Sequence, residues 1–455
     1  MRLLAGTGAR IDHWLASTTA LLAMCSHALV AQSAPLALSG ALRIGAAKVD
    51  ITPRDLHKVN PNDFGDFGGV HDPVFARALV ADNGHTAVAI VSLDVNQTGS
   101  TLALRQRIRR ELGIAVDHIL ISVSHTHSAP MIGHPSPGSV AKSGGAEVDA
   151  YTTFVDDKVV AALRQAQAAL QPAHLAVGTG HADVNVNRDV YTPRGYVYGH
   201  NDDGPSDKTV WVARFESSTG RPIAILFNYG VHPVVTRHEG LVSGDLPGAA
   251  ERYIEQQLGD PVVALWTLGP AGDQDPKVYD LPAGASATAA VAPRPSGFDL
   301  MNAQGYMIGA EVVRVASQLS ASRGDVRLAG MERVLTCPFK PGIAQQPYFV
   351  TAGLPPEQLP GVPIRLGLIL IDDLAITAVS GEVLTRLFWR LRQASPLRKT
   401  VMVTMANDSS GYLIDDASFD LPTIEMRASP LTRGCAESGI VNGLVDMINA
   451  GIRQE

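Results

Sequence analysis

Two histidines separated by one residue follow a largely apolar segment of the chain. Residues 119–123 predict a buried strand, and His125 and His127 come shortly after it. Alternate residues of a strand project to the same side, so both imidazoles are expected to lie together at the C-terminal end of the strand. Two neutral imidazoles on a rigid element are typical of a zinc site. Hydrogen bonds to carboxylates or to the backbone would explain the pair equally well.

Three further side chains that can bind a metal or move protons also follow apolar strands. They are His232, Glu382, which is expected just inside the start of a helix, and Tyr412, in a loop. Each has an ordinary structural explanation: His232 can cap a strand, the helix dipole favours Glu382, and Tyr412 can be half-buried. Sites in α/β sheets collect at the carboxyl ends of strands, so the recurrence of this pattern favours one shared site.

The elements that must position these side chains alternate between strands and helices. Strands at 74–81 and 86–94, then a helix at 100–112, precede the histidine strand, and a second helix is expected at 148–170. This order predicts an α/β fold of mixed β-sheets layered with helices. Residues 184–207, rich in Asn, Asp and Arg, are expected to form a long connection without regular structure, which is usually functional or disordered.

Composition is that of a globular protein. The 455 residues are 45% hydrophobic and 18% charged, and the formal net charge is −7 without any basic block. Binding to nucleic acid through a basic, phosphate-facing surface is therefore not expected. No internal repeat or clear linker is visible, so residues 34–455 are expected to form one domain.

The beginning of the chain has the pattern of a secretory signal peptide. Arg2 and Arg10 precede an apolar segment that ends in small residues, so residues 1–33 are expected to be removed on export to the periplasm or the exterior. Cys337 and Cys435 would then be the remaining cysteines. They can form one disulfide in an oxidising compartment, or remain as two buried thiols.

Several motifs together resemble one known family. In this order, they resemble the catalytic domain of the neutral/alkaline (non-lysosomal) ceramidases: ISVSHTHSAP at 121–130, NYGVHP at 228–233 with SGDLPG at 243–248, GPAGDQDP at 269–276, SGE at 380–382 and ANDSSGYL at 406–413. The resemblance runs from about Arg43 to the C-terminus. It implies the fold of that catalytic domain.

The resemblance also implies a ligand set and residue roles. A single zinc ion would be held by four side chains: His125, His232, Glu382 and Tyr412. His127 would sit beside the metal and assist proton transfer, and Arg188, after Asn187, would contact substrate. Tyr412 and Arg188 are also expected to stabilise the oxyanion. Carboxylates expected either to orient the imidazoles or simply to form turns are Asp94, Asp245 and Asp273.

The chemistry that follows is hydrolysis of an amide by metal-activated water, with ceramide or another N-acyl lipid as the expected substrate. Zinc lowers the pKa of a coordinated water from 15.7 to about 7. His127 would give a proton to the departing amine. Contact with a membrane is expected to be peripheral at most, since no amphipathic insertion with exposed aromatic residues is visible. The sequence predicts no particular oligomeric state.

Two departures from the family keep alternatives open. The chain is expected to lack the family's C-terminal immunoglobulin-like domain, and Gly269 stands where the family has a serine once suspected as nucleophile. The same site acting on a glycan or a small amide or ester, and a non-catalytic binding protein, remain alternatives. A serine hydrolase is the weakest, because no GxSxG motif surrounds Ser124 or Ser128.

Overall fold

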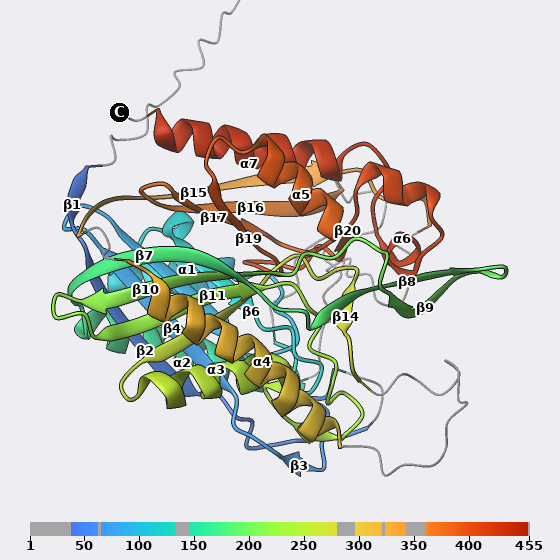
Figure 1. Ribbon diagram of the computed structural model, residues 1–455, viewed down its shortest axis with the longest axis horizontal. Helices are drawn as coiled ribbons and strands as arrows, with labels where there is room; N and C mark the ends of the chain where they lie inside the picture. The colour runs from blue at the N-terminus through green and yellow to red at the C-terminus, as the bar shows by residue number, and fades with distance from the viewer. Residues whose placement is uncertain are drawn as a thin grey trace, which may run out of the picture. The chain divides into compact units, whose positions relative to one another are not determined.

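Two β-sheets pack face to face, and helices cover the outer face of each (Figure 1). The computed structural model describes residues 38–61, 65–132, 146–279, 296–320, 324–342 and 361–453, all within the compact unit Leu36–Glu455. The predicted signal peptide lies outside the described residues. Sheets layered with helices confirm the predicted fold class.

The larger sheet has eight strands and carries the histidine segments. Its order is β13 (Val263–Leu268), β11 (Pro222–Tyr229), β10 (Thr209–Ser217), β7 (Gln171–His181), β2 (Arg43–Asp50), β4 (Phe75–Asp82), β5 (Ala87–Leu93) and β6 (Ile119–Val123). Strands β5 and β6 run parallel, as do β11 and β13. Strands β5 and β6 are nearly continuous in Val, Ile, Leu and Ala because both of their faces are covered.

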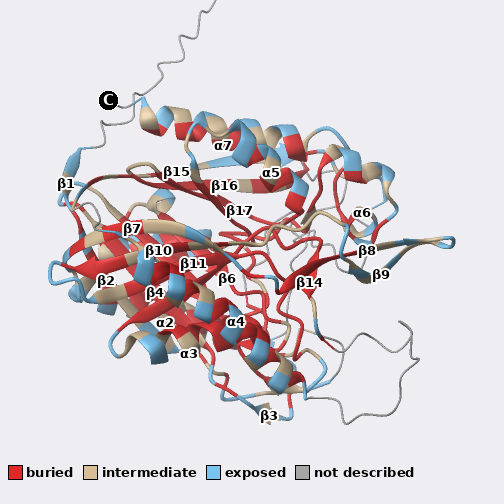
Figure 2. Cartoon of the chain, in the orientation of Figure 1, coloured by how far each residue is buried: buried red, intermediate tan, exposed pale blue. Residues whose placement is uncertain are grey.

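The smaller sheet has five strands in the order β1 (Ser39–Ala41), β15 (Asp325–Cys337), β16 (Val362–Ile371), β17 (Leu374–Val379) and β19 (Lys399–Val403). One face packs against the larger sheet through a shared apolar cluster that includes Ile90, Leu120, Ile369 and Ile376. Burial is therefore concentrated between the two sheets and beneath the helices (Figure 2).

Helices form the outer layers. Those against the larger sheet are α1 (Leu102–Leu112), α2 (Ala146–Ala168), α3 (Asp245–Leu258) and α4 (Gly297–Gln318). Those against the smaller sheet are α5 (Thr385–Ala394) and α7 (Ala436–Ile452), and the short α6 (Ile424–Ala428) lies beside β9 and β20. Among the described residues, no helix has the length and apolarity needed to cross a bilayer.

Smaller sheets complete the fold, and two of them correct the sequence predictions. The segment expected to lack regular structure contains the hairpin β8 (Asn185–Thr192) and β9 (Gly195–Asn201), and β14 (Gln274–Pro276) extends it. Glu382 lies in the short strand β18 (Glu382–Val383), paired with β20 (Tyr412–Leu413), and not in a helix. The third pairs β3 (Gly69–Val70) with β12 (Leu241–Val242).

The larger sheet curls so that its two edges approach each other. β13 and β6 are opposite edge strands, yet β13 also contacts β4, β5 and β6. The segment after β19 bridges them: the Thr404 N–H donates to Leu268 O at 2.8 Å, and the Asn407 N–H donates to Ile121 O at 2.8 Å. Loops from distant parts of the sequence therefore meet at one end of the sheet.

Cys337 and Cys435, for which the sequence allowed either a disulfide or two buried thiols, are bonded to each other. Cys337 at the end of β15 and Cys435 before α7 form a disulfide with Sγ–Sγ 2.01 Å. It joins positions 98 residues apart and holds α7 against the smaller sheet.

Candidate metal centre

Histidines from two loops converge on the carboxylate of Glu382 in β18. His232 Nε2 lies 3.0 Å from Glu382 Oε2, and His125 Nε2 lies 3.7 Å from the same oxygen. His125, His127 and His232 also form a group whose ligand atoms all lie within 4.8 Å of one another. The structure thus brings together His125, His232 and Glu382, which the sequence placed at the ends of separate strands.

The His125 segment reaches the site by a route the sequence did not predict. Strand β6 ends at Val123, and His125 has φ +67°, in the left-handed region that costs an L-residue about 1–2 kcal/mol. The alternation of a strand therefore does not place His127 beside His125. A loop does so instead, with the His125 N–H bonded to Val95 O and the His127 N–H bonded to Pro233 O. Strain of this kind is concentrated at functional sites.

Backbone carbonyls, and not carboxylates, fix the two imidazoles. His125 Nδ1 lies 2.6 Å from Asn96 O, and His232 Nδ1 lies 2.7 Å from Ala271 O. A carbonyl oxygen only accepts hydrogen bonds, so each Nδ1 carries the proton and each Nε2 presents a lone pair. Such orienting contacts are typical of metal-binding histidines.

The resulting arrangement fits a divalent cation. Two Nε2 lone pairs face an ionised carboxylate oxygen, and these groups repel one another unless a proton or a cation lies between them. His125 Nε2 is buried and has no hydrogen-bond partner among the described residues, and both histidines are at most 4% exposed. Nitrogen and oxygen donors of this kind suit zinc. The side chains present therefore fit the predicted zinc ion.

Glu382 and Tyr412 are positioned by the same small sheet. They are paired residues of parallel strands β18 and β20, and the Glu382 N–H donates to Gly411 O. Burial raises the pKa of the Glu382 carboxyl, but the neighbouring imidazoles of His125 and His232 outweigh this and hold the pKa well below its ordinary value. Burial and the nearby Glu382 raise the pKa of Tyr412 well above its ordinary value, although Arg188 opposes this.

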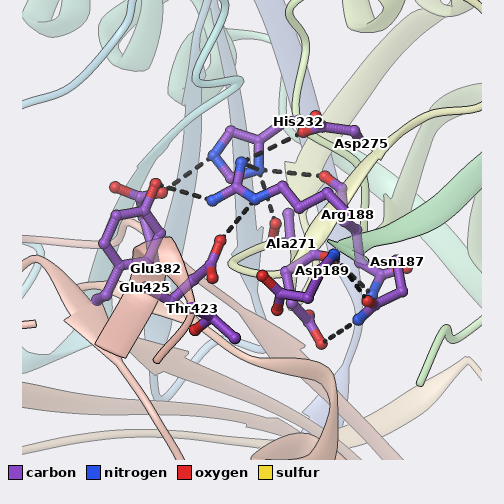
Figure 3. Close-up of polar contacts among 12 residues, drawn as sticks. Asn187, Arg188, Asp189, His232, Ala271, Asp275, Glu382, Thr423 and Glu425 are labelled. Carbon is purple, nitrogen blue, oxygen red and sulfur yellow. Dashed lines mark hydrogen bonds and ion pairs between the residues drawn. The ribbon is translucent and has the colours of Figure 1, made fainter. Parts of the chain in front are cut away.

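Arg188 lies at the centre of a buried polar network (Figure 3). Its Nη2 donates to the Tyr412 hydroxyl at 3.0 Å, its Nε to Glu425 at 2.6 Å and its Nη1 to Asp275 at 3.2 Å. Burial alone would lower the pKa of Arg188, but these three neighbours raise it well above its ordinary value. The guanidinium is therefore charged at every working pH.

His127 borders the cluster. Its ring centroid lies 4.9 Å from that of His125 and 6.0 Å from that of His232. Burial, with the two neighbouring imidazoles, holds the pKa of His127 well below its ordinary value. The structure places this residue close enough to ligate a metal as well as to move protons.

The chain matches a known protein family. A family model described as neutral/alkaline non-lysosomal ceramidase, N-terminal, matches residues 43–326. The chain belongs to this ceramidase family. A curated relative, neutral ceramidase A of Dictyostelium discoideum, is 27% identical over 235 residues, which are 46% of this chain and 32% of that protein. The chain thus aligns with about a third of that relative's length. The resemblance predicted from the motifs is confirmed.

Solved ceramidase structures share the fold. The crystal structure of neutral ceramidase from Pseudomonas aeruginosa matches with a TM-score of 0.68 at 18% identity, covering 91% of this chain and 75% of that chain. A structure described as ceramidase complexed with C2 matches with a TM-score of 0.70, with the same identity and coverage. These matches confirm the predicted ceramidase-like architecture.

The departure at Gly269 has a steric reason. A Cβ built there would lie 2.9 Å from Gly230 N and 3.0 Å from Asn228 Oδ1, so a serine would not fit without movement. Ser128 Oγ accepts a hydrogen bond from Thr236, and Ser124 Oγ is buried with no hydrogen-bond partner in the part of the chain that the structure describes. These contacts do not favour a serine nucleophile in this member of the ceramidase family.

The three carboxylates considered for orienting the imidazoles have other partners. Asp94 pairs with Arg77 at 2.8 Å, Asp245 accepts from Thr236, and Asp273 accepts from Thr385. Sequence reasoning missed Asp275 and Glu425, which hold Arg188. Asp275 lies in GPAGDQDP and could have been considered as a carboxylate after a strand, whereas nothing in the local sequence distinguishes Glu425.

Proposed function

We propose that this protein is an exported, zinc-dependent hydrolase that cleaves the amide bond of ceramide or of another N-acyl lipid. The observation that carries the proposal is the convergence of the His125 and His232 Nε2 lone pairs on Glu382, inside a buried site. Membership in the ceramidase family supports the reaction class. The disulfide between Cys337 and Cys435 supports an oxidising location.

The residues that would hold the metal are those implied by the family resemblance: His125, His232, Glu382 and Tyr412. Zinc bound by such a set acts as a Lewis acid and lowers the pKa of a coordinated water to about 7, which supplies the nucleophile at neutral pH. The protein's own contribution is to fix the imidazoles through backbone carbonyls and to keep the site buried.

The remaining groups handle protons and charge. His127 lies beside the cluster, where its imidazole can accept a proton from the attacking water and return it to the departing amine nitrogen. The Tyr412 hydroxyl accepts a hydrogen bond from the charged Arg188, and together they would stabilise the negative charge that develops on the carbonyl oxygen. Because the guanidinium is held before substrate arrives, little reorganisation is needed during the reaction.

A surface feature favours a lipid over a soluble substrate. The hairpin β8–β9, whose base carries Arg188, projects away from the sheets (Figure 1). Near its tip, Tyr191 is 72% exposed and Val197 is 45% exposed. Tyrosine is suited to the boundary between lipid and water. The sequence showed no amphipathic insertion with exposed aromatic residues, and whether this hairpin contacts a membrane stays a prediction.

The test combines metal content with turnover. The purified protein is expected to contain about one zinc ion per chain and to hydrolyse a labelled ceramide. His125→Asn should abolish both, and asparagine is chosen because it tolerates the left-handed backbone at this position. His181→Asn, at an exposed histidine, is the matched control and should change neither. Full turnover in His125→Asn would overturn the proposal.

A further inference from the structure

The side chain of Glu425 is fully buried and reaches the metal centre only through other residues. It lies on α6, is 0% exposed, and its Oε1 accepts a hydrogen bond from Arg188 Nε at 2.6 Å. A buried carboxylate is costly unless it is paired, so this contact has a large effect on where the guanidinium can lie. Figure 3 shows Glu425 approaching Arg188 from the side opposite Asp275.

The geometry around Arg188 leaves it one orientation. Glu425 and Asp275 take the Nε and Nη1 donors, while the rings of Tyr198 and Tyr412 lie 5.5 and 5.6 Å from its guanidinium carbon. In this orientation Nη2 points at the Tyr412 hydroxyl, 3.0 Å away. A planar guanidinium has fixed donor directions, so an acceptor at Nε determines where Nη2 points.

The same helix also holds the backbone of Tyr412. Ser429 follows α6 directly, and its hydroxyl donates to Tyr412 O at 2.9 Å. The α6 segment therefore contacts Tyr412 at its carbonyl directly and at its hydroxyl through Arg188. The two contacts together restrict both ends of this residue.

We propose that Glu425 is a positioning residue, which sets the guanidinium of Arg188 and thereby aims the Tyr412 hydroxyl at the donors His125, His232 and Glu382. The inference rests on the proposed function, because that function gives Tyr412 its role as a ligand. Without the Glu425 carboxylate, Arg188 Nε loses its acceptor and the guanidinium is free to turn towards Asp275. The Tyr412 hydroxyl then loses the donor that orients it.

The test measures zinc affinity by competition with a chelator, which needs no substrate. Glu425→Ala is expected to weaken zinc binding by about 10–100-fold, the usual effect of removing a residue that orients a ligand. Glu425→Gln keeps a carbonyl oxygen for Arg188 Nε and should lose less. It also provides a folded variant should the alanine variant fail to fold. Glu437→Gln, at another buried acid that pairs with Arg390 on α5, is the control and should leave zinc affinity unchanged.

A double-mutant cycle separates positioning from general support of the fold. In a Tyr412→Phe background, Glu425→Gln should change the zinc dissociation constant less than about twofold, because the hydroxyl through which it acts is gone. An equal loss in both backgrounds would overturn the inference. A wild-type protein that binds no zinc would overturn both proposals. If Glu425 and Tyr412 remain coupled in their effect on zinc affinity but the protein hydrolyses no N-acyl substrate, only the proposed function would be overturned.

Discussion

The carboxyl group of Asp189, beside Glu425, gives a prediction whose magnitude follows from the structure. Asp189 lies on β8, next to Arg188, and hydrogen-bonds Glu425. Burial, followed by the charge of Glu425, raises the pKa of Asp189 to about 8. In the unfolded chain the pKa returns to about 3.9. The folded protein therefore keeps a proton at this position that the unfolded chain releases.

The sign and size of the effect follow from proton linkage. Between about pH 4 and pH 8 the folded state binds one more proton than the unfolded state, so this group makes stability fall as pH rises. A difference of one proton corresponds to about 1.4 kcal/mol per pH unit, or about 3 kcal/mol between pH 5 and pH 7. Its stabilising contribution is complete below the unfolded pKa and is lost as pH approaches 8.

Asp189→Asn removes this titration while it keeps a hydrogen-bond donor for Glu425 at every pH. The assay is urea-induced unfolding of both proteins at pH 5, 6 and 7 with the same zinc saturation. The difference in free energy of unfolding between variant and wild type is compared, because the other titrating groups contribute equally to both proteins. We expect the variant to gain stability relative to the wild type as pH rises. Asp203→Asn, at an exposed aspartate, should show no such trend. A difference between Asp189→Asn and wild type that does not change with pH would refute the reasoning.

Three further predictions address the ligand set, the disulfide and the substrate. His127→Gln should keep zinc but lower turnover by about 10²–10⁴-fold; loss of zinc would instead indicate a three-histidine site, as the clustering with His125 and His232 allows. Cys337→Ser should lower the free energy of unfolding by about 2–5 kcal/mol, and a reductant should do the same to the wild type but not to the variant. Tyr191→Ser should slow hydrolysis of an N-acyl lipid in vesicles but not of a short soluble analogue; equal rates on both would argue against lipid contact by the hairpin.

The apolar strands could be predicted because their pattern is local. The expected strands at 74–81 and 86–94 correspond to β4 and β5, and the expected helix at 148–170 corresponds to α2, each within two residues at either end. Continuous runs of Val, Ile and Ala leave few other interpretations when both faces of a strand are covered. The positions of donors at strand ends could be predicted for the same reason.

The hairpin that carries Arg188 could not be predicted in this way. Asn185, Asn187 and Arg188 are buried, although their sequence reads as a polar loop. Their partners lie far away in the chain: Asn185 bonds to Gly230 O, Asn187 to Asp273, and Arg188 to Glu425. A polar strand is stabilised here by acceptors that only the folded chain supplies, so local hydrophobicity carries no signal for it.

The convergence of the donors depends on how the edge of the larger sheet is closed. Among the described residues β6 is the terminal strand of its sheet, and Asn407 provides hydrogen bonds at the edge where a further strand would pair. Asn407 Oδ1 accepts from the Ile121 N–H, its Nδ2 donates to Ile119 O, and its backbone N–H donates to Ile121 O. The same segment bonds through Thr404 to the end of β13, the opposite edge. Residues 404–407 therefore bond to the ends of both edge strands and bring the loops of His125 and His232 together. The same segment continues directly into Tyr412.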